Sequence, residues 1–308
     1  MLINQANLDA LRTTFGTQYS AGYARTQTFY DKICTEIPSN SKSNTYGWVA
    51  QMLVLREWLG PRVALNLSEH SYVLANKTFE GTVEVDRDDI EDDNLGIYTG
   101  VMMPQLGEAT KKHPDILVRS LINANTALAF DGLSLFNAAH LTFDKTGTTA
   151  TYQNDFNLTL DANTFNTVWS AMASYVGEDG LPLGVMPNLL IVPPQLKLAA
   201  LTIMNGGLYS PITGQPGAGA IAIENPLKGW CEVLVVPELA STPAAWYLAD
   251  TTKAIKPFVF QNRRAPNFVS RDNPNDPKVF DLKKFTYGVD YRGNVGITLP
   301  FLIARGHA

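Results

Sequence analysis

The sequence has little cysteine, little histidine and little charge. Two cysteines, Cys34 and Cys231, are too few for a disulfide framework and form no zinc-site spacing, so both are expected to be small buried residues. No two of the four histidines are three or four residues apart, so no metal-binding pair on a helix is predicted. Charged residues make up 17%, against a usual share of about a quarter. A chain with so few charges often hides surface against partners.

The charge that is present is slightly negative. A net charge of -5 and a pI of about 5.4 argue against a dedicated nucleic-acid-binding protein. No apolar run approaches the ~20 residues that a membrane-spanning helix needs. The first 15 residues lack the continuous apolar core of a signal peptide. We therefore expect no membrane association and a reducing compartment, which suits two unpaired thiols.

Motifs for catalysis are also missing. There is no phosphate-binding Gly-x-x-x-x-Gly-Lys loop and no Gly-x-Ser-x-Gly turn. Residues 217–222 imitate a dinucleotide fingerprint, but no strand precedes them and Pro226 blocks a following helix. His140 is expected to be a hydrogen-bonded structural residue. We predict no catalytic residue, no cofactor and no metal site, and hence no enzyme.

The pattern of apolar residues predicts a mixture of helices and strands. Leu8, Leu11, Phe15 and Tyr19 recur at helical spacing, and Gly22 is expected to end that helix. Further helices are predicted over 46–59 and over much of 95–130, where prolines are expected to break or kink the helix. The second half alternates short strands and helices, and residues 279–303 are largely β. No regular βαβ alternation is seen, so the fold class is α+β.

Residues 62–85 are expected to form an extended hairpin with few neighbours in its own chain. Phe79, Gly81, Val83 and Val85 alternate with polar residues at a period of two, which is typical of a strand. A two-stranded hairpin alone is only marginally stable in water. Something outside the chain should therefore cover it.

An acidic cluster follows the hairpin between Glu84 and Asp93. It could be a solvated loop, or it could place Glu91, Asp92 and Asp93 before a helix N-terminus, where the helix dipole favours negative charge. It could also pair with cations of a neighbouring subunit. A cation site is less favoured, because the spacing is not that of a calcium-binding loop.

Several stretches resemble the Mu-like phage major head subunit family, and they occur in the family's order along the chain. The resembling stretches are Arg56–Gly60, Tyr72–Glu80, Arg87–Asp93, Phe130–His140 and Tyr287–Gly293. The order of parts is similar to that of the Hong Kong 97-type phage capsid fold. Some shells of that fold cross-link a lysine at the position of Lys77 to an asparagine, although a solvated turn lysine is the favoured reading here.

The resemblance implies a division of the chain into five parts. These are an N-terminal arm (1–60), an E-loop hairpin (61–94), a peripheral domain with a long spine helix (95–150), an axial domain (151–255), and the return strands of the peripheral domain with a C-terminal strand (256–308). It implies a major capsid protein of a tailed double-stranded DNA bacteriophage, assembling as hexamers and pentamers of an icosahedral shell. Such a protein is made in the host bacterial cytoplasm, resides in the virion and encloses DNA without sequence-specific binding. Portal, scaffold and decoration proteins are candidate partners, with the scaffold as a separate protein.

The hairpin and the acidic cluster supply the predicted contacts between subunits. The residues predicted to make them are Arg62, Tyr72, Lys77, Phe79, Glu80, Arg87, Glu91, Asp92 and Asp93. Two other readings remain open at this stage. One is another virion protein, such as a decoration or tail protein. The other is a cytoplasmic enzyme with a site in residues 164–236, which would need a nucleophile beside a base.

Overall fold

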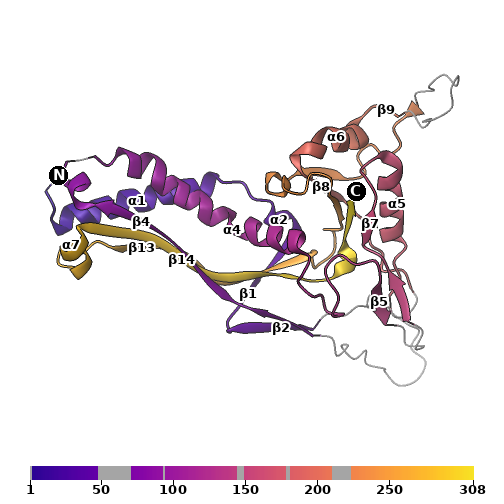
Figure 1. Ribbon diagram of the computed structural model, residues 1–308, viewed down its shortest axis with the longest axis horizontal. Helices are drawn as coiled ribbons and strands as arrows, with labels where there is room; N and C mark the ends of the chain where they lie inside the picture. The colour runs from indigo at the N-terminus through magenta and orange to yellow at the C-terminus, as the bar shows by residue number, and fades with distance from the viewer. Residues whose placement is uncertain (1, 48–70, 93, 144–148, 178–180, 210–222) are drawn as a thin grey trace.

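The computed structural model in Figure 1 has an elongated body, in which helices lie along long strands, and a more compact block at one end. The structure describes residues 2–47, 71–92, 94–143, 149–177, 181–209 and 223–308. The helices are α1 (Gln5–Arg25), α2 (Tyr30–Ile33), α3 (Arg87–Glu91), the π-helical turn η1 (Tyr98–Met102), α4 (Met103–Ala124), α5 (Ala162–Ala173), α6 (Lys197–Asn205) and α7 (Pro277–Leu282), with short 3-10 turns η2 (Pro194–Leu196), η3 (Pro237–Leu239) and η4 (Pro300–Leu302).

Within these described ranges, the strands are distributed over two larger sheets and three two-stranded ladders. They are β1 (Cys34–Pro38), β2 (Ser43–Gly47), β3 (Ser71–Ala75), β4 (Lys77–Asp86), β5 (His140–Phe143), β6 (Thr149–Tyr152), β7 (Asp155–Asn157), β8 (Leu189–Val192), β9 (Leu208–Tyr209), β10 (Ile223–Glu224), β11 (Glu232–Val235), β12 (Trp246–Ala249), β13 (Phe258–Arg271), β14 (Lys284–Ile297) and β15 (Ile303–His307). Helices and strands are interspersed along the chain, which confirms the α+β prediction.

The elongated body is a four-stranded sheet of order β1-β13-β14-β4, with α1 and α4 lying along it (Figure 1). β1 pairs with β13 in parallel, and the other pairs are antiparallel. α4 keeps Pro104 in its first turn, where proline is tolerated, but it also runs through Pro114. It ends at Asn125, which adopts the left-handed conformation that often closes a helix.

The two long helices touch through their backbones. A Cβ added at Gly22 of α1 would lie 2.2 Å from the carbonyl oxygen of Pro104, and one added at Gly107 of α4 would lie 2.2 Å from that of Tyr19. The predicted apolar face of α1 is buried in the structure. Gly22 does not end α1, contrary to the sequence prediction, because the helix continues to Arg25. Its lack of a side chain serves the helix crossing instead.

The compact block is built on a five-stranded sheet of order β11-β8-β12-β15-β7. β8 is the buried apolar strand that the sequence predicts, and all four of its residues are buried. β15 lies inside this sheet, whereas β13 and β14 lie in the other, so the segment after residue 257 contributes to both sheets. One apolar core connects the two parts, because Val118 and Ile122 of α4 share it with Phe258 of β13 and Tyr247 of β12.

Two sequence predictions need correction here. Residues 77–86 do not lack neighbours in their own chain, because β4 pairs along its whole length with β14. Tyr46 and Gly47 lie in β2 and not at the start of a helix, while residues 48–59 of that predicted helix lie outside the described part of the chain. Local pattern identifies a strand, but it does not say which distant strand will pair with it.

Candidate assembly surface

The described part of the predicted hairpin, 71–85, does not pair with itself: β4 pairs with β14, and β3 pairs with β2, which precedes the predicted range, in a two-stranded ladder at the edge of the elongated body (Figure 1). β2 and β3 are antiparallel, and the register runs from Ser43 opposite Ala75 to Gly47 opposite Ser71. Tyr46 and Tyr72 face each other in this register, and aromatic residues favour such cross-strand positions. A ladder of this size needs support from outside itself.

That support comes from the four-stranded sheet. The hydroxyl of Tyr46 donates to the amide oxygen of Gln261 at 2.8 Å, and the side-chain amide of Asn294 donates to the carbonyl oxygen of Ala75 at 2.8 Å. At Gly296, an added Cβ would approach the side chains of Leu74 and Tyr72 to 2.9 Å. The base of the hairpin is therefore fixed to β13 and β14 of its own chain.

Tyr72 is consequently oriented toward its own subunit. Its side chain is half-buried, and burial raises the pKa of Tyr72 by more than a backbone hydrogen bond at Ile297 lowers it. On the same strand, Val73 is 58% exposed and is available to a partner. Tyr72 supports the hairpin base in this structure, and its contact with a neighbouring subunit stays a prediction.

β4 is an edge strand with two different faces. Val83 and Val85 are buried, whereas Glu80, Thr82 and Glu84 are exposed, which confirms the period of two read from the sequence. Within the described residues β14 is the one strand that pairs with β4. An edge strand offers unpaired backbone N–H and C=O groups to a strand from elsewhere.

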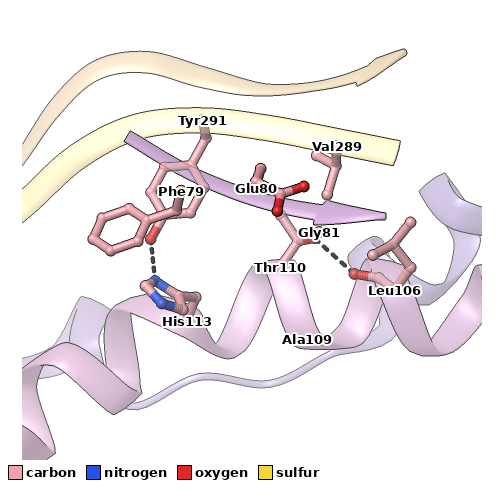
Figure 2. A pocket seen from close by; sticks show the side chains of 9 residues that line it. All are labelled: Phe79, Glu80, Gly81, Leu106, Ala109, Thr110, His113, Val289 and Tyr291. Atoms are coloured by element: carbon pink, nitrogen blue, oxygen red, sulfur yellow. Dashed lines mark hydrogen bonds between the residues drawn. The ribbon is translucent and has the colours of Figure 1, made fainter. Parts of the chain in front are cut away.

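Phe79 points from β4 toward α4, as Figure 2 shows. Its ring centroid lies 4.4 Å from that of His113 and 5.2 Å from that of Tyr291. Nδ1 of His113 and the hydroxyl of Tyr291 are hydrogen-bonded, and burial lowers the pKa of His113. These side chains border a cavity of about 170 Å³ between α4 and the sheet, with Thr110 and Leu106 farther along it. Phe79 is thus a packing residue between the strand and the long helix.

Lys77 and Glu80 lie on the exposed part of the same strand. Lys77 opens β4 opposite Gly293 and is exposed. Glu80 is exposed too, and its carboxylate accepts a hydrogen bond from the hydroxyl of Thr82 at 2.6 Å. Both side chains are exposed, and their contact with a neighbouring subunit stays a prediction.

The acidic cluster forms a small helix, α3. Asp86 caps it by accepting the N–H of Asp88 at 3.0 Å, and Asp88 and Asp89 lie in its first turn. Arg87 pairs with Glu91 at 2.8 Å along one face of this helix. Glu91 is the last residue of α3 and Asp92 is its C-cap, and both precede η1 and α4 in the chain, whereas Asp88 and Asp89 are the acids in the first turn of a helix. Negative charge in a first turn is favoured by the helix dipole.

Part of the cluster is neutralised within the subunit. Glu84 accepts hydrogen bonds from Lys278 at 2.6 Å and from Lys284 at 2.8 Å, and these bonds lower the pKa of Glu84 to about 2. Sequence reasoning missed both partners, since they are far along the chain. Asp92 is exposed. Arg62 and Asp93, the remaining predicted contact residues, lie outside the described residues.

The described ranges hold no group of three or more His, Cys, Asp or Glu side chains that could bind a metal ion. Among their helices, none is long and apolar enough to cross a membrane. Cys34 and Cys231 are both buried and unpaired, as the sequence predicts. The structure thus shows a supported hairpin base, an edge strand and a capped acidic turn. The base precedes and follows residues 48–70 in the sequence, whereas the acidic turn lies at the opposite end of the ten-residue strand β4.

Comparison with known proteins gives a match over almost the whole chain. The family described as "Mu-like prophage major head subunit gpT" matches residues 8–158, 156–239 and 238–308. Among curated proteins, the major capsid protein of Escherichia phage Mu is 27% identical over 297 residues, which cover 96% of this chain and 72% of that protein.

Solved phage capsids show the same likeness in three dimensions. The chain is similar to the procapsid protein of bacteriophage JBD30 with a TM-score of 0.62 and 31% identity, covering 99% of this chain and 76% of that one. It is also similar to the JBD30 capsid decorated with minor capsid protein trimers, with a TM-score of 0.50, 27% identity, and coverage of 77% and 99%. The predicted capsid fold is thereby confirmed.

Proposed function

Because the chain belongs to the Mu-like prophage major head subunit family, we propose that it closes into an icosahedral shell of hexamers and pentamers around double-stranded DNA. Membership makes it a major capsid protein of a tailed phage and places it in the virion. The observation that carries the finer proposal is the likeness to a solved procapsid over 99% of the chain. Repeated contacts between unlike surfaces of identical subunits close into rings, and rings can close into a shell.

The same proposal assigns a role to each part of the chain. The long helix α4 serves as the spine of the peripheral domain, and the five-stranded sheet serves as the axial domain. The E-loop (61–94) makes contact with a neighbouring subunit, where removal of apolar surface from water contributes ~25 cal/mol per Å². Lys77 and Glu80 in the first half of β4, and Arg87 with the acidic turn beyond its far end, make polar contacts with neighbouring subunits.

Partners other than a second copy are also part of the proposal. A JBD30 capsid carries minor capsid protein trimers, and a decoration protein of that kind is a candidate partner here. A portal protein, a separate scaffold and DNA bound without sequence preference complete the set. The subunit is made in the host bacterial cytoplasm, with which two unpaired buried thiols agree.

Deletion of residues 48–70, which contain the end of the predicted N-terminal arm and the first part of the predicted E-loop, tests the role of this junction in assembly. Gly47 and Ser71 are opposite each other in the ladder, so a two-residue Asn-Gly turn can replace the segment without moving its ends. The full chain should form closed shells in negative-stain electron microscopy. The deletion variant should keep its circular dichroism spectrum and its urea midpoint but form no shells.

A matched control replaces residues 144–148 by the same turn between Phe143 and Thr149, which are also opposite each other. This control should still form shells. Normal shells from the 48–70 deletion would show that the segment is not needed for assembly. A full chain that remains a small monodisperse species under all assembly conditions would overturn the shell itself.

A further inference from the structure

The segment that follows α4 is tied to the rest of the molecule by buried polar groups. Asn125 exchanges two hydrogen bonds with Phe136: its side-chain amide donates to the carbonyl oxygen at 2.9 Å and its side-chain oxygen accepts the N–H at 2.8 Å. Leu135 and Phe136 are buried in the core that α4 shares with both sheets. Residues 125–140 thus lie where the elongated body meets the compact block.

At the centre of this junction lies an ion pair without exposure to water. The side chains of Asp131 and His140 are both 0% exposed, and Oδ2 of Asp131 lies 2.6 Å from Nδ1 of His140. The other ring nitrogen, Nε2, lies 3.1 Å from the carbonyl oxygen of Leu135. When Asp131 is ionised, both nitrogens therefore face groups that can only accept. A neutral imidazole has one N–H, so both contacts are hydrogen bonds only when the ring is an imidazolium.

The carboxylate is arranged to remain charged. Burial raises the pKa of Asp131, but the hydrogen bond and charge of His140 and the N–H of Leu133 outweigh burial, so its pKa lies below the usual value. Oδ1 accepts that N–H at 3.1 Å, so both carboxylate oxygens have donors. A buried ion pair is tolerated when all its hydrogen-bonding positions are filled in this way.

A neighbouring amide extends the pair to the five-stranded sheet. The side-chain amide of Asn154 donates to the carbonyl oxygen of Leu135 at 2.8 Å and to that of Ile303, in β15, at 3.2 Å. Its side-chain oxygen accepts the N–H of Asn137 at 2.8 Å. His140 and Asn154 therefore both contact the carbonyl oxygen of Leu135 and fix the same stretch of backbone.

We propose that both ring nitrogens of His140 carry a proton and that its pair with Asp131 is a proton-dependent clamp holding the segment after α4 against the five-stranded sheet. This inference goes beyond the proposed assembly and does not depend on it. Removing the proton leaves a lone pair facing the carbonyl oxygen of Leu135 or leaves the buried carboxylate without its donor. Either outcome leaves a buried polar group unsatisfied, which opens the junction.

The other titratable groups around the ring are few. Tyr152 of β6 stacks on His140 with centroids 5.1 Å apart, and Tyr175, which follows α5, packs on Tyr152. Burial raises the pKa of both phenols, so both stay neutral beside the pair. Arg305 of β15 lies beyond the ring of Phe136 and is neutralised by Asp155 at 2.7 Å. The charge on the ring is thus matched chiefly by Asp131.

The direction of the pH effect follows from these contacts. A proton removed from the ring by alkali takes away the donor to Asp131 or to Leu135, so the stabilisation by the pair is lost on the alkaline side. The stabilisation by ionised Asp131, whose pKa is lowered, is lost only as the pH falls through that lowered value. The clamp is therefore closed above the pH at which Asp131 becomes protonated, and it opens in alkaline solution.

The first test observes the protons directly. The full chain is labelled with ¹⁵N histidine, and the ring nitrogens are followed by NMR from pH 6 to pH 9, with assignment by replacing each of the other histidines in turn. Both nitrogens of His140 should carry a proton at pH 7. An unprotonated ring nitrogen at pH 7 would overturn the proposal.

The second test uses Asp131→Asn, which preserves the shape of the site. The new amide can donate to Nδ1 of a neutral ring, whose Nε2 proton still reaches Leu135, so the variant should fold. In the wild type, the urea unfolding constant should rise with pH as the ring loses its second proton, by at most about tenfold for each pH unit. Asp131→Asn should flatten this rise, and His307→Gln should not. Parallel profiles for wild type and Asp131→Asn would refute the clamp.

Discussion

The backbone contact between α1 and α4 predicts a large effect from a single methyl group. In Gly107→Ala, the new Cβ would lie 2.2 Å from the carbonyl oxygen of Tyr19 and 2.7 Å from the N–H nitrogen of Tyr23. Real Cβ atoms essentially never come within 3.0 Å of another atom, and both obstacles are backbone. The helices must therefore move apart by close to an ångström or more.

That separation weakens the packing of the apolar face of α1. Leu8 and Phe15 are 0% exposed and belong to a core that also contains Val85 and Tyr287 of the sheet. Overpacking of this kind typically costs about 1–3 kcal/mol. In a helix without such a contact, alanine for glycine would instead stabilise by about 0.4–1 kcal/mol. The predicted sign is therefore opposite to that of helix propensity.

Urea unfolding of the purified chain, followed by circular dichroism, measures this difference. Gly100→Ala is the matched control, because Gly100 lies in η1 just before α4 and an added Cβ meets nothing within 4 Å. We expect Gly107→Ala to lower the urea midpoint and Gly100→Ala to leave it unchanged or raise it. Equal midpoints for the two variants would refute the reasoning about the crossing.

Two further predictions concern charge. Burial, followed by the charges of Glu238 and Asp31, raises the pKa of Asp115 to about 6, although the N–H groups of Phe29 and Tyr30 partly oppose this. The folded chain then holds this proton more tightly than the unfolded chain, so the free energy of unfolding falls as the pH rises from about 4 to 6. Asp115→Asn should remove that fall and stabilise the chain at pH 7 by on the order of 2 kcal/mol. Parallel pH profiles of the urea midpoint for the variant and the wild type would contradict this prediction. Reversing the exposed charges at Glu91 and Asp92 should impair shell formation in light scattering more than subunit folding in circular dichroism, whereas equal loss of both would indicate a purely local role.

Sequence periodicity identified faces better than it identified partners. The spacing of Leu8, Leu11 and Phe15 correctly predicts the buried side of α1. Gly22 was misread as a stop because its function depends on Pro104, a residue far along the chain. Likewise, the period of two in β4 gives its two faces, but not its pairing with β14. A repeat distance records which side is buried and carries no information on what buries it.

The candidate site shows the same limit. Negative charge after the hairpin correctly suggested a helix start, but the helix is α3, capped by Asp86. Glu84 lies 194 residues from Lys278, so their pairing could not be read from local charge. Contacts with neighbouring subunits depend on surfaces that face away from the chain's own core. For that reason the intersubunit contacts of Lys77, Glu80 and Asp92 stay predictions. Phe79, in contrast, has a packing role within the subunit.

The place of the last strands in both sheets has a consequence for the order in which the chain folds. In the described part of the molecule, β1 pairs with β13, β4 with β14 and β7 with β15. Each of these three earlier strands therefore pairs with a strand that is synthesised only after residue 257. At synthesis rates of about 5–20 residues per second, those partners appear roughly 3–10 s later than the rest of the chain. Neither sheet can be completed on a ribosome that has not reached them. Unfinished chains therefore lack the rigid surfaces that another subunit would recognise, and their unpaired strands are the ones in need of chaperones.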